Sequence, residues 1–453
     1  MPNNYVLLER TELNAEAASV SFSNIPQSGY TDLKIVTSAR TTKSGAGADW
    51  VKISFNGVTT NLSMRVLYGE ASTAGSYTDT SIYGAIGSNS QTSNTFGNTE
   101  FYIPNYTGSS NKSVSADAVS ENNSSSGNYL NFSAGLWSST AAITSITLTP
   151  YTGPNFAANS TFSLYGLAAL GTTPAIAPKA SGGNRIDNDG TYWYHTFTSS
   201  GTFTPQLTLS CDVLVVAGGG GGGTRGNRGG GGGGAGGLLA FTAQSITATA
   251  QTITVGAGGA SSISGSNSQF ASLTASVGGG RGASDTGDGR TGGSGGGGWM
   301  DEAGYSGTSG QGNAGGAGSV FSVGANTYVA GGGGGASAAG NAGVTNGGAG
   351  GTNGKGGNGS TTYSSWGLAT NTGQNVSGTV YYAGGGGGGS GTYFGTDGYA
   401  SVGGFGGGGA GTGSTTSGVG TAGTISTGGG GGGANYNAGG AGGSGIVIIR
   451  YPI

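Results

Sequence analysis

Asp212-Val-Leu-Val-Val-Ala-Gly-Gly-Gly-Gly-Gly-Gly223 joins a short apolar run to six unbroken glycines. Glycine loses more backbone freedom on folding than any other residue, so a folded domain needs a reason for such a run. The polyproline-II-type helix supplies one, because only glycine lets these rods pack closely enough to bond through their backbones. We therefore predict a bundle of packed polyglycine rods. Similar runs return at residues 229–234, 331–335, 384–389, 406–409 and 428–433.

Between these runs, glycines also recur at every third position. A polyproline-II helix has about three residues per turn, so this spacing predicts a rod with a single glycine edge facing another rod. The alternative is a disordered low-complexity linker, which the flanking apolar strands and interleaved aromatic residues disfavour. The spaced glycines are Gly304, Gly307 and Gly310; Gly312, Gly315 and Gly318; Gly403, Gly406 and Gly409; and Gly439, Gly442 and Gly445.

Two continuous apolar runs bracket the glycine-rich region, at residues 213–216 and 445–451. Strands of this kind need cover on both faces, so we expect them to lie near each other and to close the base of the region. Residues 191–198 and 201–204 alternate apolar and polar side chains around Ser199-Ser-Gly201. This pattern predicts a hairpin just before the first apolar run.

The first part of the chain has a different composition, since only 15 of the 107 glycines fall in residues 1–180. Seven short segments mostly alternate apolar with polar residues, as half-buried strands do. We therefore predict a mainly β protein: a jelly-roll-like β-sandwich at 1–170, a linker at 171–185 and a glycine-rich polyglycine-II domain at 186–453. The predicted strands are 20–22, 33–35, 51–55, 62–66, 101–103, 143–148 and 162–164.

The composition excludes several classes of function. Charged residues make up 7% of the 453 residues and the net charge is −3, without a basic cluster, which disfavours nucleic acid as a partner. The sequence shows no apolar run of about 20 residues for a membrane span and no signal-peptide pattern. We expect no membrane insertion, and synthesis in the cytoplasm without secretion machinery.

Residues suited to catalysis or metal binding are few and scattered. His195 is the only histidine and Cys211 the only cysteine, so neither can form a metal site or a catalytic triad with a second residue of these types. Both are expected to be structural and buried. Asp187-Asn-Asp-Gly190 is typical of a turn. We therefore expect no enzyme activity, no catalytic residues, no cofactor and no bound metal.

Short aromatic segments lie between the glycine runs, where connections between rods would emerge. Tyrosine, tryptophan, asparagine, serine and glycine together make adaptable binding surfaces, which points to recognition of a receptor. The alternative is that these aromatic residues only cap the apolar ends of their rods. The candidate receptor-binding residues are Trp299, Met300, Tyr305, Tyr363, Trp366, Tyr393, Phe394, Phe405 and Tyr436.

Three motifs in the second half resemble the glycine-rich domains of bacteriophage fibre proteins. They are His195-Thr-Phe-Thr with Gly201-Thr-Phe-Thr204, Val213 to Gly223, and Gly443-Ser-Gly-Ile-Val-Ile-Ile-Arg-Tyr451. The layout also resembles the fibre-tip adhesins of T-even-type phages, in which glycine motifs alternate with receptor-contacting loops. The first half, from Tyr5-Val-Leu-Leu-Glu-Arg10 to Phe162, is similar to a β domain in virion structural proteins of phages that infect marine bacteria.

These resemblances imply a virion fibre protein at the surface of the phage particle, tail fibre or tail-associated. Its implied partners are a host-surface glycan or outer-membrane protein, other virion proteins and further copies of the chain, as a homotrimer. Two alternatives remain open: a non-catalytic decoration or head-fibre protein of the virion, and an ice-binding protein.

Overall fold

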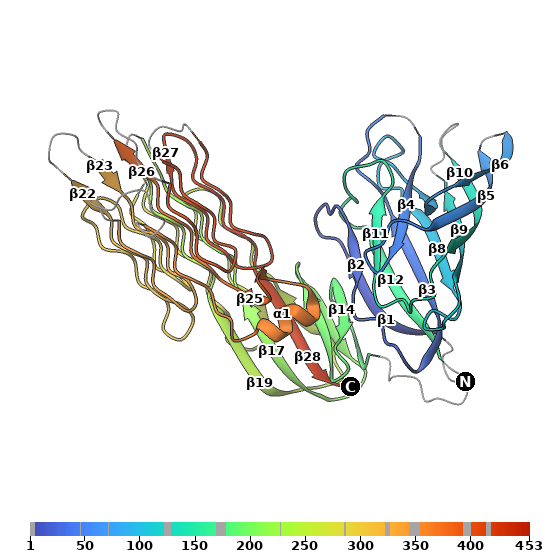
Figure 1. Ribbon diagram of the computed structural model, residues 1–453. Helices are drawn as coiled ribbons and strands as arrows, with labels where there is room; N and C mark the ends of the chain where they lie inside the picture. Colours follow the sequence, from blue (N-terminus) through green and yellow to red (C-terminus); the bar gives the residue numbers. More distant parts are fainter. Residues whose placement is uncertain are drawn as a thin grey trace. The chain divides into compact units, whose positions relative to one another are not determined.

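The chain folds into two compact units in the computed structural model (Figure 1). The first unit comprises residues 1–179, 184–193 and 452–453, and the second comprises residues 180–183 and 194–451. The linker predicted at 171–185 falls partly outside the described residues, and its described part contains a short strand at Ala180–Ser181 and the start of another at Arg185. The structure describes residues 5–45, 47–70, 72–121, 128–168, 178–226, 228–284, 287–321, 327–343, 354–392, 400–413 and 418–453.

The first unit is built from antiparallel strands in two sheets. One sheet has the order β14-β1-β12-β3-β8-β9-β10-β5-β6, and the other has the order β2-β11-β4-β7. The strands are β1 (Tyr5–Glu12), β2 (Val20–Phe22), β3 (Tyr30–Ala39), β4 (Asp49–Phe55), β5 (Leu62–Glu70), β6 (Thr73–Asp79), β7 (Ile82–Ile86), β8 (Gly97–Ile103), β9 (Lys112–Ser120), β10 (Tyr129–Trp137), β11 (Ile146–Pro150), β12 (Thr161–Ala168) and β14 (Arg185–Asn188).

The two sheets share one hydrophobic core, as the predicted sandwich requires. Phe55 and Ile146 from the smaller sheet and Ile35 and Phe101 from the larger one are fully buried in the same cluster. Buried and exposed residues alternate strictly in β9 and in residues 130–137 of β10. That alternation follows from the two-residue period of a strand, which sends successive side chains to opposite faces. The prediction of a mainly β fold is confirmed.

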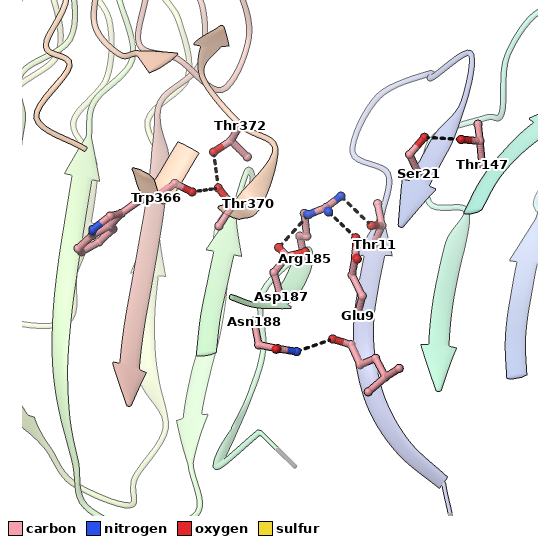
Figure 2. A network of polar contacts seen from close by, with 11 residues as sticks. Glu9, Thr11, Ser21, Thr147, Arg185, Asp187, Asn188, Trp366, Thr370 and Thr372 are labelled. Carbon is pink, nitrogen blue, oxygen red and sulfur yellow. Dashed lines mark hydrogen bonds and ion pairs between the residues drawn. The ribbon is translucent and has the colours of Figure 1, made fainter. Parts of the chain in front are cut away.

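Strand β14 is held against β1 by a buried ionic network (Figure 2). Arg185 donates from Nε to Asp187 Oδ2 at 2.8 Å, from Nη2 to Glu9 Oε1, and from Nη1 to Thr11 Oγ1 at 3.3 Å. The predicted turn is only partly correct. The carboxylate of Asp189 accepts bonds from the amides of residues 191 and 192, as in a turn, whereas Asp187 belongs to β14 and is buried.

The second unit combines a small β base with a bundle of extended glycine segments. Its strands are β13 (Ala180–Ser181), β15 (Tyr192–Phe197), β16 (Gly201–Pro205), β17 (Leu209–Val216), β18 (Thr224–Arg225), β19 (Leu238–Ile246), β20 (Gln251–Thr254), β21 (Gln269–Phe270), β22 (Ser319–Phe321), β23 (Thr327–Val329), β24 (Gln374–Val376), β25 (Thr379–Tyr381), β26 (Ser390–Thr392), β27 (Ala434–Asn435) and β28 (Ile446–Pro452), and its helix is α1 (Ser364–Thr370).

The two apolar strands that bracket the glycine region pair directly. β17 lies antiparallel to β28, with Asp212 opposite Arg450 and Val216 opposite Ile446, and β19 pairs with the other edge of β17. The prediction that these strands close the base is therefore confirmed. The hairpin predicted at 191–204 is wrong: β15 neighbours β28, whereas β16 pairs with β13 and β20 in a separate sheet. The chain crosses between the sheets so that His195 and Phe203 pack together, with ring centroids 5.1 Å apart.

The glycine segments form the predicted hydrogen-bonded rods. Each amide of residues 218–223 donates a hydrogen bond to a neighbouring segment at 2.8–3.1 Å. Amides three residues apart donate to the same segment. Amides 218 and 221 donate to residues 266 and 263, amides 219 and 222 to residues 443 and 440, and amides 220 and 223 to residues 234 and 231. The carbonyls accept from three further segments, so six segments surround this rod. That threefold repeat is the backbone geometry of a polyproline-II-type helix.

In the last glycine segment, the glycines at every third position form one edge of a rod that faces a neighbour, as predicted. A Cβ atom at Gly439, Gly442 or Gly445 would lie about 2 Å from a carbonyl oxygen of residues 222, 219 and 216 respectively. These three glycines therefore face one neighbour, the strand and rod at 216–222. Gly310 differs: its φ of +75° and the open space around it belong to a turn.

Candidate functional site

The glycine bundle leaves little room for side chains along its length, so side-chain chemistry collects at its two ends. In Figure 1 the segments run from a base, which carries β17, β28 and α1, to a far end, which carries β22, β23, β26 and β27. We call the latter the distal end. The candidate receptor-binding residues that the structure describes do not gather at one place, because connections leave the bundle at both ends.

At the distal end, a cation lies between two aromatic rings. The guanidinium carbon of Arg228 is 5.9 Å from the ring centroid of Trp299 and 5.6 Å from that of Tyr328. Tyr328 is buried in β23, which pairs with β22 and β26. Met300 follows Trp299 with a φ of +49°, and both residues are partly exposed. Contacts of a cation with aromatic faces hold such a cluster in place at a surface.

Tyr305 fixes the connection that follows Trp299. Its hydroxyl donates to Glu302 Oε1 at 2.5 Å, and its ring lies beside Gly289, where a Cβ atom would come within 2.5 Å of it. Partial burial, together with the hydrogen bond to the Glu302 carboxylate, raises the pKa of Tyr305 above its usual range. The side chain is therefore a neutral hydrogen-bond donor at physiological pH, with its face packed on the bundle.

Tyr436 is the most exposed of the described candidates, with 58% of its surface accessible. It follows β27 at the distal end with a φ of +62°, a backbone conformation that is uncommon for a residue with a side chain. Its neighbour Asn435 is 1% exposed, and neither polar atom of the Asn435 side-chain amide has a hydrogen-bond partner.

Three other candidates lie at the base. Trp366 of α1 is 5% exposed and packs under the Arg450 guanidinium at 4.4 Å, with the Tyr363 ring at 5.4 Å. Within α1, Thr370 donates to the Trp366 carbonyl at 2.8 Å (Figure 2). Phe405 is 40% exposed and contacts Tyr381 of β25, with ring centroids 5.4 Å apart. These contacts show packing that anchors α1 and β25 to the base.

The remaining candidates, Tyr393 and Phe394, lie outside the described residues. Sequence reasoning passed over Tyr328, although it precedes a run of five glycines at 331–335 just as Val216 and Ala217 precede the first run. Its place just before a glycine run was the feature of the sequence that could have indicated a residue at the end of a rod. Among the described residues, Arg228, Trp299, Met300, Tyr305, Tyr328 and Tyr436 make up the distal candidate surface.

His195 and Cys211 are buried, as the sequence indicated. The Gly182 carbonyl can only accept, so Nδ1 of His195 carries the proton in their 2.6 Å bond, and Nε2 faces the Tyr451 hydroxyl at 3.0 Å. Burial lowers the pKa of His195 to about 4, and burial beside Asp212 raises the pKa of Cys211 to about 12. The described residues contain no group of three or more histidine, cysteine or acidic side chains placed to hold a metal ion.

The buried His195 predicts a loss of stability in acid. Its pKa falls from 6.5 in the unfolded chain to about 4 in the folded one, so the unfolded state binds more protons between these values. Stability is therefore full above pH 6.5 and falls as the pH drops toward 4, by about 3 kcal/mol. Denaturant unfolding of the wild type and of His195→Gln from pH 7 to pH 4 measures this difference. Equal pH slopes in the two proteins would contradict the prediction.

Among the described residues, no helix has the length and apolar character needed to cross a membrane. Comparison with known proteins matches residues 198–452 to the glycine-rich domain family. No curated protein and no solved structure matches the chain. The family match begins in the base of the second unit, at the turn before β16, and ends in β28. It covers more than half of the sequence, and the chain thus belongs to the glycine-rich domain family.

Proposed function

We propose that the chain is a bacteriophage virion fibre protein that recognises the host surface through the distal end of its glycine bundle. One observation carries the proposal: backbone hydrogen bonds build the bundle with almost no side chains, while aromatic side chains and Arg228 collect where the rods end. The resemblance of the strand motifs to phage fibre domains supports the same function. The proposed activity is binding without catalysis.

The proposed ligand is a host-cell glycan or an outer-membrane protein. Exposed aromatic rings stack on the apolar faces of sugars and also anchor protein interfaces, where truncating such an anchor typically costs about 2 kcal/mol or more. Tyr436, at 58% exposure, is the described residue best placed for this role, and Trp299 beside Arg228 is the second. Other virion proteins and further copies of the chain are the proposed partners within the particle.

The test uses fluorescently labelled full-length protein and a panel of marine Gram-negative isolates. On cells that bind the protein, Tyr436→Ala together with Trp299→Ala is expected to raise the apparent Kd by roughly 30-fold or more, the equivalent of about 2 kcal/mol. Phe405→Ala is the matched control, because Phe405 is also an exposed aromatic residue but lies at the base. Its Kd is expected to equal that of the wild type.

A thermal melt of each variant separates a lost contact from a lost fold. Equal losses for the distal variant and the Phe405 control would contradict recognition at the distal end. If the wild type binds no isolate and does not compete with phage adsorption, a decoration protein of the virion takes the place of the adhesin.

A further inference from the structure

The first unit carries an exposed apolar surface on the outer face of its larger sheet. Strands β5, β10 and β9 lie side by side there, with Phe132 paired to Leu67 on one side and to Asp117 on the other. We call this surface the β10 face. Its large apolar residues and their exposed fractions are Leu67 62%, Phe132 54%, Leu130 46%, Val119 41% and Leu136 36%.

This exposure is unusual for a strand whose other face is packed. The opposite face of β10 lies against the core, where Trp137 is 3% exposed, so these apolar side chains lie outside the hydrophobic core of the first unit. A groove of about 520 Å³ runs between Leu67, Phe132 and their neighbours Arg65 and Asp117. Contiguous exposed apolar surface of this kind marks an interaction site in soluble proteins.

Charged side chains lie on either side of the apolar centre, and their arrangement indicates which partner binds the β10 face. Arg65 lies on β5 and Asp117 on β9, the two strands on either side of β10, and both are exposed. The two strands are about 10 Å apart, and neither Arg65 nor Asp117 forms an ion pair with another described residue. The face therefore has a cationic side and an anionic side around an apolar centre.

We infer that the β10 face binds the β10 face of another copy of this chain. Where the β5 side of one copy meets the β9 side of the next, Arg65 reaches Asp117 of opposite charge and the apolar centres are buried together. A self-complementary face of this kind closes a two-fold dimer, in place of the homotrimer that the resemblance implies. The inference deepens the homo-oligomer named under the proposed function and rests on it.

Sedimentation velocity of the full chain at micromolar concentration tests this inference. The wild type is expected to be an oligomer, and Arg65→Asp and Asp117→Arg are each expected to be monomeric because like charges then meet. The double variant Arg65→Asp with Asp117→Arg restores opposite charges and is expected to recover the oligomer. Phe132→Ser is expected to be monomeric, whereas Ile263→Ser, which alters an apolar residue of the second unit at 54% exposure, leaves the oligomer intact.

A monomeric wild type overturns the inference, as does an oligomer that survives Phe132→Ser or a double swap that fails to associate. Because all four positions are exposed, the far-ultraviolet circular dichroism spectra of the variants are expected to match that of the wild type. The cell-binding assay keeps the two proposals apart. A monomer that binds cells overturns only the β10 interface, and an oligomer that binds none overturns only host recognition.

Discussion

Gly386→Ala is expected to abolish folding of the glycine bundle. A Cβ atom at Gly386 would lie 2.0 Å from the carbonyl oxygen of Gly431 and 2.6 Å from its carbonyl carbon. These are backbone atoms of a neighbouring rod, which no rotamer change can move aside. The same residue donates to Gly233 at 2.9 Å and accepts from Gly333 at 2.8 Å, so separating the rods also breaks the bonds that hold them.

The expected loss exceeds the range of about 1–3 kcal/mol for overpacking a side-chain core, because here the backbone itself must shift. A loss above about 5 kcal/mol is comparable to the whole stability of many domains. Circular dichroism and scanning calorimetry measure it. Gly201→Ala is the control, since a Cβ atom there meets only the Phe197 ring at an ordinary 3.4 Å. A Gly386→Ala protein that melts with the wild type would disprove close rod packing.

Much of the second unit could be predicted because its physics is local. A glycine edge repeating every third residue permits only one kind of close contact, so Gly439, Gly442 and Gly445 indicated a rod facing a neighbour before any partner was known. The apolar runs of β17 and β28 indicated two strands that are buried on both faces, and both strands are buried and pair with each other. Both predictions depend on residue type and spacing alone.

Strand partners could not be predicted in the same way. Alternation in residues 191–204 indicates strands, yet it does not say in which sheet each strand lies, and β15 and β16 join different sheets. Asp187 precedes residues typical of a turn, but its carboxylate pairs with the guanidinium of Arg185 in the buried network between β14 and β1. Such contacts depend on where distant segments meet.

The end of the bundle at which each candidate residue lies could not be predicted from the sequence either. The sequence shows which residues connect the rods, but the end at which a connection emerges depends on how many rods precede it and in which direction each runs. Trp299 and Tyr436 thus lie at the distal end, whereas Trp366 and Phe405 lie at the base. Trp366 is buried because it belongs to α1, which packs on the base. This helix is too short to produce a sustained helical periodicity in the sequence, so it could not be predicted.

Arg185→Met is expected to destabilise the first unit by about 3–5 kcal/mol at pH 7, the usual effect of removing one partner from a buried ion pair. The side chains of Arg185, Glu9 and Asp187 are 12%, 5% and 1% exposed. Burial already raises the pKa of both carboxyls, and the positive charge of Arg185 is what opposes that rise. Methionine fills a similar volume but leaves two carboxyl groups without a cation.

The sign of the pH dependence follows from these raised pKa values. An acid whose pKa is higher in the folded state keeps its stabilising effect at low pH and loses it as the pH rises through the folded value. The penalty of Arg185→Met is therefore expected to be smallest near pH 4 and to grow toward pH 8. Adding Glu9→Gln and Asp187→Asn removes the buried charges, and is expected to recover most of the loss and flatten the pH profile.

Arg10→Met provides the matched comparison on the same strand. Arg10 pairs with Glu12 at 2.9 Å, but their side chains are 30% and 37% exposed, and an ion pair this accessible contributes less than about 1 kcal/mol. Urea unfolding of the variants, followed by tryptophan fluorescence from pH 4 to pH 8, measures each difference. If Arg185→Met and Arg10→Met cost the same and share one pH profile, then the Arg185 network adds no more to stability than a surface pair, and β14 is held to β1 by its backbone hydrogen bonds alone.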